Sequence, residues 1–171
     1  MRRICLYLAL LPALLCGLTL TAQAAGPAGS ISVSFYSETG GAYQSAVEAD
    51  RVQLTLNGAS LTPDGVPALV QYVDGDGRTL VPVRLVSEAL SAEVLWVAET
   101  RQVIILKGED TIVLTLGSAQ ASINGVITDL PGQVPACAVK YNGLESTMVP
   151  LRFVSEALEA QVGWDKDTFT G

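Results

Sequence analysis

The chain contains no histidine and only three cysteines. Copper and zinc sites of the usual kind need imidazole or thiolate ligands, and with no histidine and one cysteine beyond residue 24 such a site is not expected. The composition excludes a catalytic nucleophile activated by histidine. Cations are scarce as well, because ten lysines and arginines stand against seventeen acidic residues, which gives a formal net charge of −7. An acidic chain of this kind is not expected to bind nucleic acid or an anionic membrane surface.

The N-terminus has the pattern of a secretory signal peptide. A basic start at residues 1–3 precedes an apolar run at residues 4–15, and a small-x-small site formed by Ala22 and Ala24 follows before Ala25. We therefore predict that residues 1–24 are a signal peptide, cleaved between Ala24 and Ala25. The alternative is a retained membrane anchor, but the run is shorter than the roughly 20 residues that span a bilayer. No membrane span is expected after cleavage.

Cleavage would change both the charge and the cysteine count. Loss of Arg2 and Arg3 takes the formal net charge from −7 to −9, and Cys137 is then the one cysteine left. A single thiol cannot form an internal disulfide, so the exported chain must be held together by its core. Cys137 stands between two alanines, which predicts a buried and unreactive thiol rather than a reactive or intermolecular one.

The most informative feature of the remaining chain is an internal repeat. The segment Thr79–Leu90 returns as Thr147–Leu158, 68 positions later, and the match continues to Trp96 and Trp164 without a gap. A match of this length predicts two copies of one structural unit.

Each copy has the pattern of a ββαββ unit. Alternating strands run into Asn-Gly turns, and an amphipathic stripe begins at Pro82 and again at Pro150. Proline suits the first position of a helix, so we predict a helix of about three turns there. The fold class is therefore α+β, with two tandem ββαββ-type units, each a small, mainly antiparallel sheet packed on one short helix. Trp96 and Trp164 are expected to pack against these helices, with sugar stacking as the alternative.

The repeat also divides the chain. Residues 25–49 are expected to be an N-terminal strand and linker, 50–117 the first repeat, and 118–171 the second repeat, which lacks the final strand seen at Val103–Leu106. Either the chain is a piece of a longer protein, or Ser30–Tyr36 fills the gap. An open strand edge would also allow self-association.

The repeated block resembles a known family, the copper amine oxidase N-terminal-like domain. The residues that carry the resemblance run from Gly77 to Arg84, then through Glu88, Ala92 and Trp96, and recur in the second copy. The resemblance implies a secreted bacterial module, often in tandem and beside cell-wall enzymes, with a small antiparallel sheet around one helix. The catalytic domain of those oxidases holds copper on three histidines, which this chain lacks, so copper and oxidase chemistry do not carry over.

Few residues suggest a site. Arg84 and Glu88 lie four apart on the first predicted helix, as do Arg152 and Glu156 on the second. Each pair is either a weak ion pair within its helix or part of a surface patch for a wall polymer or partner protein.

A calcium site is a further possibility to consider. The acidic run Asp74-Gly75-Asp76-Gly77 has few of the ligands that a calcium loop supplies, and its residue types favour a tight turn. No metal, cofactor or catalytic residue is therefore expected.

These observations predict a non-catalytic, secreted module associated with the cell envelope, which binds a cell-wall polymer or envelope protein or acts as a spacer. The alternative is that the chain is the N-terminal targeting region of a longer secreted cell-wall enzyme, such as an amidase or another hydrolase.

Overall fold

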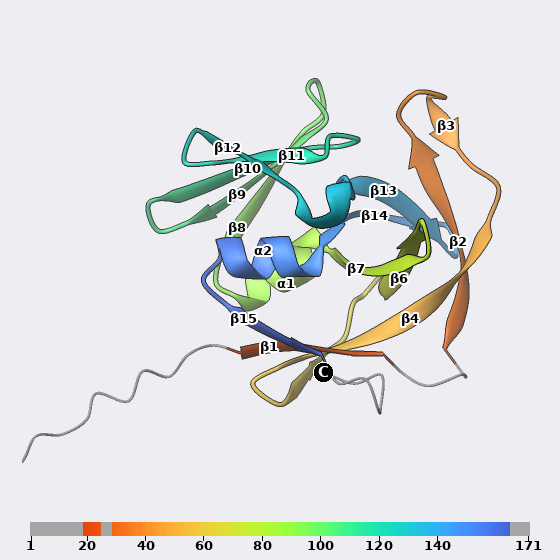
Figure 1. Cartoon of the computed structure of the whole chain (residues 1–171), viewed down its shortest axis with the longest axis horizontal. Helices are drawn as coiled ribbons and strands as arrows, with labels where there is room; N and C mark the ends of the chain where they lie inside the picture. Colours follow the sequence, from red (N-terminus) through yellow and green to blue (C-terminus); the bar gives the residue numbers. More distant parts are fainter. Residues whose placement is uncertain (1–18, 25–28, 165–171) are drawn as a thin grey trace, which may run out of the picture.

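The computed structural model describes residues 19–24 and 29–164 (Figure 1). Strands dominate, and two short helices accompany them, so the α+β class is confirmed. The strands are β1 (Thr19–Ala24), β2 (Ser30–Ser37), β3 (Ala42–Tyr43), β4 (Val47–Leu56), β5 (Ala59–Leu61), β6 (Ala68–Val73), β7 (Asp76–Pro82), β8 (Glu93–Val97), β9 (Gln102–Lys107), β10 (Asp110–Thr115), β11 (Gln120–Ile123), β12 (Val126–Asp129), β13 (Cys137–Tyr141), β14 (Leu144–Pro150) and β15 (Gln161–Trp164). The helices are α1 (Val83–Ala89), α2 (Leu151–Ala157) and the 3-10 turn η1 (Pro131–Gln133).

Six strands close into a barrel. Hydrogen-bonded pairs run from β2 to β4, β6, β7, β14, β13 and back to β2, and every pair is antiparallel. Closure gives each of these strands a partner on both sides, which removes the exposed edges that isolated hairpins would present.

The barrel is filled by its own apolar side chains. Alternate residues point inward along each strand, so one face of each strand supplies the interior. The strand residues of this cluster that are at most 1% exposed are Val33, Leu69, Leu80, Val139 and Met148. Buried apolar side chains therefore occupy the interior of the barrel.

The two copies pair with each other in the barrel wall. In the antiparallel β7–β14 pair, Val81 lies opposite Val149, and these residues are 68 positions apart. The flanking pairs are reciprocal, since Leu80 faces Pro150 and Pro82 faces Met148. Equivalent residues that face each other in this way place an internal pseudo-two-fold axis between the copies.

Two-residue turns set the strand register. Asp74 and Gly75, between β6 and β7, have φ of 52° and 87°, and the counterparts Asn142 and Gly143 have 48° and 80°. Positive φ at both central residues is typical of the type I′ turn, whose twist suits a hairpin. The acidic run at Asp74 is therefore a tight turn, as its residue types predict.

The helices are shorter than the sequence predicts. Each has seven residues, about two turns, because Pro82 and Pro150 are not the first helical residues but the last strand residues, with ψ of 119° and 122°. The buried stripe is confirmed, since Val86 and Val154 are fully buried. The two helices lie side by side next to the barrel, below the five-stranded sheet in the view of Figure 1.

The predicted pair of separate ββαββ sheets is not confirmed. The hairpins β6–β7 and β13–β14 of both copies share the barrel, while β8, β9 and β10 of the first copy join β11 and β12 of the second in a five-stranded sheet, ordered β12-β11-β10-β9-β8. The physical reason is that a two-stranded hairpin is marginal alone, and pairing the copies buries both. The main apolar core lies between barrel, helices and this sheet and includes fully buried Val81, Val149, Ile105 and Ile112.

The strand beside β15 is not the one expected from Ser30–Tyr36. That segment lies in β2 and pairs with β3, β4 and β13. Instead β1 pairs with β15 in parallel and with β4 antiparallel. β1 lies within the predicted signal peptide and ends at Ala24, whereas Ala25 lies outside the described residues. Within the described residues, β15 remains an edge strand.

Candidate binding grooves

Two grooves open at the starts of the helices. One, the Trp96 groove, has a volume of about 520 Å³, and the other, the Tyr72 groove, about 730 Å³. Eight lining positions of one are the repeat counterparts of eight in the other, 68 residues apart. These pairs are Pro82 and Pro150, Val83 and Leu151, Arg84 and Arg152, Val94 and Val162, Ala138 and Val70, Glu145 and Gly77, Ser146 and Arg78, and Thr147 and Thr79. The grooves are therefore equivalent surfaces related by the pseudo-two-fold axis.

Each groove is built by both copies. The Trp96 groove takes its helix start from α1 and strand β8 of the first copy, and its opposite wall from β13 and β14 of the second. The Tyr72 groove reverses this arrangement, with α2 and β15 facing β6 and β7. The cause is the β7–β14 pairing, because it sets each helix start beside the hairpin of the other copy.

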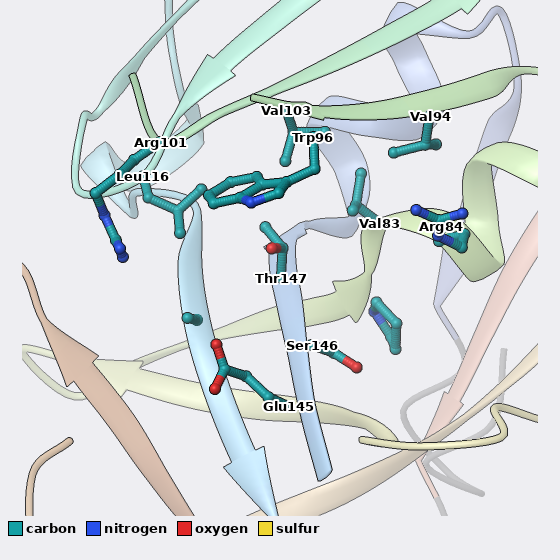
Figure 2. A pocket seen from close by; sticks show the side chains of 12 residues that line it. Val83, Arg84, Val94, Trp96, Arg101, Val103, Leu116, Glu145, Ser146 and Thr147 are labelled. Carbon is teal, nitrogen blue, oxygen red and sulfur yellow. The ribbon is translucent and has the colours of Figure 1, made fainter. Parts of the chain in front are cut away.

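Trp96 lies across the middle of its groove (Figure 2). Its side chain is 44% exposed, so the predicted packing of Trp96 into the core is wrong. The ring is on the same face of β8 as the buried Val94, as strand alternation requires. However, it lies where that face borders the groove, so part of it stays exposed. The side chain of Trp164 lies outside what the structure describes.

Polar groups surround the indole. Arg101 and Arg84 lie on opposite sides of the ring, and Glu145, Ser146 and Thr147 follow one another along β14 (Figure 2). Val103 and Leu116 supply apolar wall. The groove thus combines an exposed aromatic face with donors and acceptors, which is a common composition of ligand sites.

Residues of the β2–β3 hairpin hold the side chain of Arg101 in place. Its Nη2 lies 2.7 Å from Oε1 of Glu38, and its guanidinium lies 4.6 Å from the centre of the Tyr36 ring. Tyr36 in turn makes an edge contact with Tyr43 at 5.3 Å between ring centres. Burial, and next the nearby carboxylate of Glu145, raise the pKa of Tyr43 well above its ordinary value. These contacts fix one end of the groove before any ligand arrives.

The Tyr72 groove has different side chains at its equivalent wall. Gly77 and Arg78 replace Glu145 and Ser146, so this wall gains a cation and loses a carboxylate. Arg78 passes close over Gly132, where an added Cβ would lie 2.5 Å from Nε. Tyr72 is 59% exposed, and its hydroxyl donates to Oδ2 of Asp50 at 2.8 Å, which raises the pKa of Tyr72.

The four residues predicted as a candidate surface patch are all exposed. Arg84 lines the Trp96 groove and Arg152 lines the Tyr72 groove, while Glu88 and Glu156 are exposed and line neither. Arg84 and Glu88 form an exposed ion pair at 3.7 Å within α1. Such an exposed pair contributes little to the free energy of unfolding. Arg84 is therefore not needed for stability and is available for binding.

The Cys137 thiol is shielded from reaction. Burial, and next the charge of Glu38, raise the pKa of the Cys137 thiol to about 12, which supports the predicted inert cysteine. Within residues 19–24 and 29–164, no cluster of acidic and cysteine side chains could hold a metal ion. The same part of the chain has no helix with the length and apolarity needed to cross a membrane.

Sequence reasoning missed most of the groove residues. Arg101 and Glu145 carry no motif, and they meet only because the two copies pair across β7 and β14. A signal was nevertheless present: Glu145, Ser146 and Thr147 are the counterparts of Gly77, Arg78 and Thr79, which the family resemblance had already singled out in the first copy.

The comparisons with known proteins identify a family. No curated protein and no solved structure matches the chain significantly. A family model, the copper amine oxidase N-terminal domain, matches residues 55–170, which include both helix starts and both hairpins. That domain is the N-terminal, non-catalytic part of those oxidases. The chain therefore belongs to the copper amine oxidase N-terminal domain family.

Proposed function

We propose that this chain is a non-catalytic, secreted module that binds a polymer of the cell envelope through its two grooves. The observation that carries the proposal is the pair of equivalent grooves, each assembled from both copies. Two equivalent sites on one chain suit a ligand that repeats, because the second contact is then intramolecular and strengthens binding without new interactions. A wall polymer is a ligand of this kind.

The composition supports a binding role rather than a reaction. The chain has no histidine, and its family is named for a non-catalytic domain. Arg84 and Arg152, equivalent exposed cations at the two helix starts, are the residues that we assign to ligand contact. Secretion rests on the predicted signal peptide, and an exported chain whose mass corresponds to a start at Ala25 would support it.

Co-sedimentation tests the binding. The chain from residue 25 is mixed with purified peptidoglycan or with whole envelope fractions, and the pellet is assayed. We expect retention in at least one fraction, and loss of most of it in the double variant Arg84→Ala/Arg152→Ala. Arg51→Ala is the matched control, because Arg51 is an exposed arginine that lines neither groove. No retention in any fraction, or full retention of the double variant, would contradict the proposal.

A further inference from the structure

We propose that the Trp96 groove binds an uncharged sugar ring of an envelope glycan, stacked on the Trp96 indole. The inference rests on the proposed function and names the ligand class of one of its two grooves. Three observations carry it: the exposed indole, the polar groups around it, and the charge balance of the groove.

The indole is the first observation. Aromatic residues make up 6% of the chain, yet one of its two tryptophans is 44% exposed and lies inside a groove. Large aromatic side chains are usually buried in a core, so an exposed one lacks the stabilisation that burial provides. Its π face is negative, and the C–H bonds on the flat face of a pyranose are weakly positive, so the two surfaces attract while both release water.

The polar groups are the second observation. Sugar hydroxyls both donate and accept hydrogen bonds. Arg101 and Arg84 supply donors, Glu145 supplies an acceptor, and the hydroxyl of Thr147 supplies both. In Figure 2, Arg101 and Arg84 flank the ring, Thr147 lies next to it, and Glu145 lies further along β14. The contacts of Arg101 with Glu38 and Tyr36 hold its side chain in place, which lowers the entropy lost on binding.

The charge balance is the third observation and favours an uncharged ligand. Arg101 is paired with Glu38 at 2.7 Å and Arg84 with Glu88 at 3.7 Å, so neither cation is unopposed. Glu145 adds a negative charge to the wall, and the whole chain carries −7. An anionic sugar would therefore be repelled, whereas an uncharged one would not. The volume of about 520 Å³ falls within the range of small-molecule sites, roughly 300–1,000 Å³.

Fluorescence and calorimetry test the inference. In a Trp164→Phe background, emission reports Trp96 alone. Titration with chitotetraose or cellotetraose should change this emission saturably. By calorimetry, Trp96→Ala should weaken binding about tenfold or more, while Trp164→Phe, its repeat counterpart, should retain most of it. Circular dichroism checks that the Trp96→Ala variant is folded, which we expect because the side chain is half-exposed.

The outcomes separate this inference from the proposed function. A saturable change lost with Trp96→Ala supports the sugar site. No saturable change with either oligosaccharide, unchanged affinity of Trp96→Ala, or tighter binding of a polygalacturonate oligomer than of the uncharged probes would overturn it. If Trp96→Ala co-sediments with the envelope as well as the wild type does, the sugar site fails while the proposed function stands.

Discussion

Lys107 Nζ donates a hydrogen bond to the carbonyl oxygen of Leu158 over 2.6 Å. Lys107 ends β9 in the first copy, and Leu158 is the C-terminal cap of α2 in the second. A cation suits this position, because the last carbonyls of a helix have no partner within it and carry partial negative charge. The contact thus joins β9 of the first copy to the helix of the second.

Removing this cation should weaken the link between the copies. Lys107→Met keeps most of the apolar stem but loses the charge and the donor, so we expect the free energy of unfolding to fall by about 1 kcal/mol. Urea unfolding followed by circular dichroism measures it. Arg51→Met, which removes an exposed cation outside this contact, is the control, and equal effects of the two variants would show that the cap contributes nothing.

Removal of either of two buried hydroxyls should make the fold more stable. Ser87 and Ser155 are equivalent positions in α1 and α2, both fully buried, and neither hydroxyl has a hydrogen-bond partner. Burying an unpaired hydroxyl costs free energy, so Ser87→Ala and Ser155→Ala should each raise the free energy of unfolding by about 1 kcal/mol. Thermal unfolding measures the change. A lower melting temperature in both variants would mean that these hydroxyls are paired in solution.

Gly117 controls the position of Glu38, the partner of Arg101. It has φ of +79°, and an added Cβ would lie 2.5 Å from Cγ of Glu38. Gly117→Ala should therefore cost roughly 1 kcal/mol for the backbone and a further 1–3 kcal/mol for the clash. Gly108→Ala is the matched control, because φ is +60° but nothing lies within 4 Å of the added carbon. If urea unfolding gives the same loss in the free energy of unfolding for both alanine variants, the Glu38 side chain moves aside without cost.

The Cys137 thiol should make stability depend on alkaline pH. Its pKa is raised from 9.0 to about 12, so in the folded chain the thiol keeps its proton at pH values where the unfolded chain loses it. The unfolded state then binds fewer protons, and stability falls as pH rises from about 9 to 12.

Cys137→Ala should reduce this loss, and urea unfolding at a series of pH values between 8 and about 12 measures it. Below pH 8 the two proteins should show the same pH dependence. Tyr43, whose pKa is also raised, should account for part of the loss that remains in the variant. An unchanged slope in the variant would mean that the thiol is accessible to solvent.

Local structure was predictable from the sequence. The tight turn at Asp74 and Gly75 and the buried helix stripe that contains Val86 follow from residue types and short spacings. These features depend on interactions between residues close in sequence, which is why pattern and turn chemistry suffice.

The assembly of the copies was not predictable in the same way. A repeat indicates two units but not whether each closes on itself or on the other. The decisive contact, between Val81 and Val149, joins residues far apart in the chain. The spacing of apolar residues along the sequence does not reveal such a contact. The exposure of Trp96 has the same origin, because it depends on where the hairpin of the second copy ends. The grooves are therefore a product of the pairing rather than of either copy.

Expression of the first copy alone tests this pairing most directly. Residues 50–117 contain β6, β7, α1 and β8 but lack β2, β13 and β14, which complete the barrel. We predict that this fragment shows no cooperative unfolding by circular dichroism, while the chain from residue 25 unfolds in one cooperative transition. A fragment 50–117 that folds and melts cooperatively alone would contradict the account, because each copy would then be an independent domain.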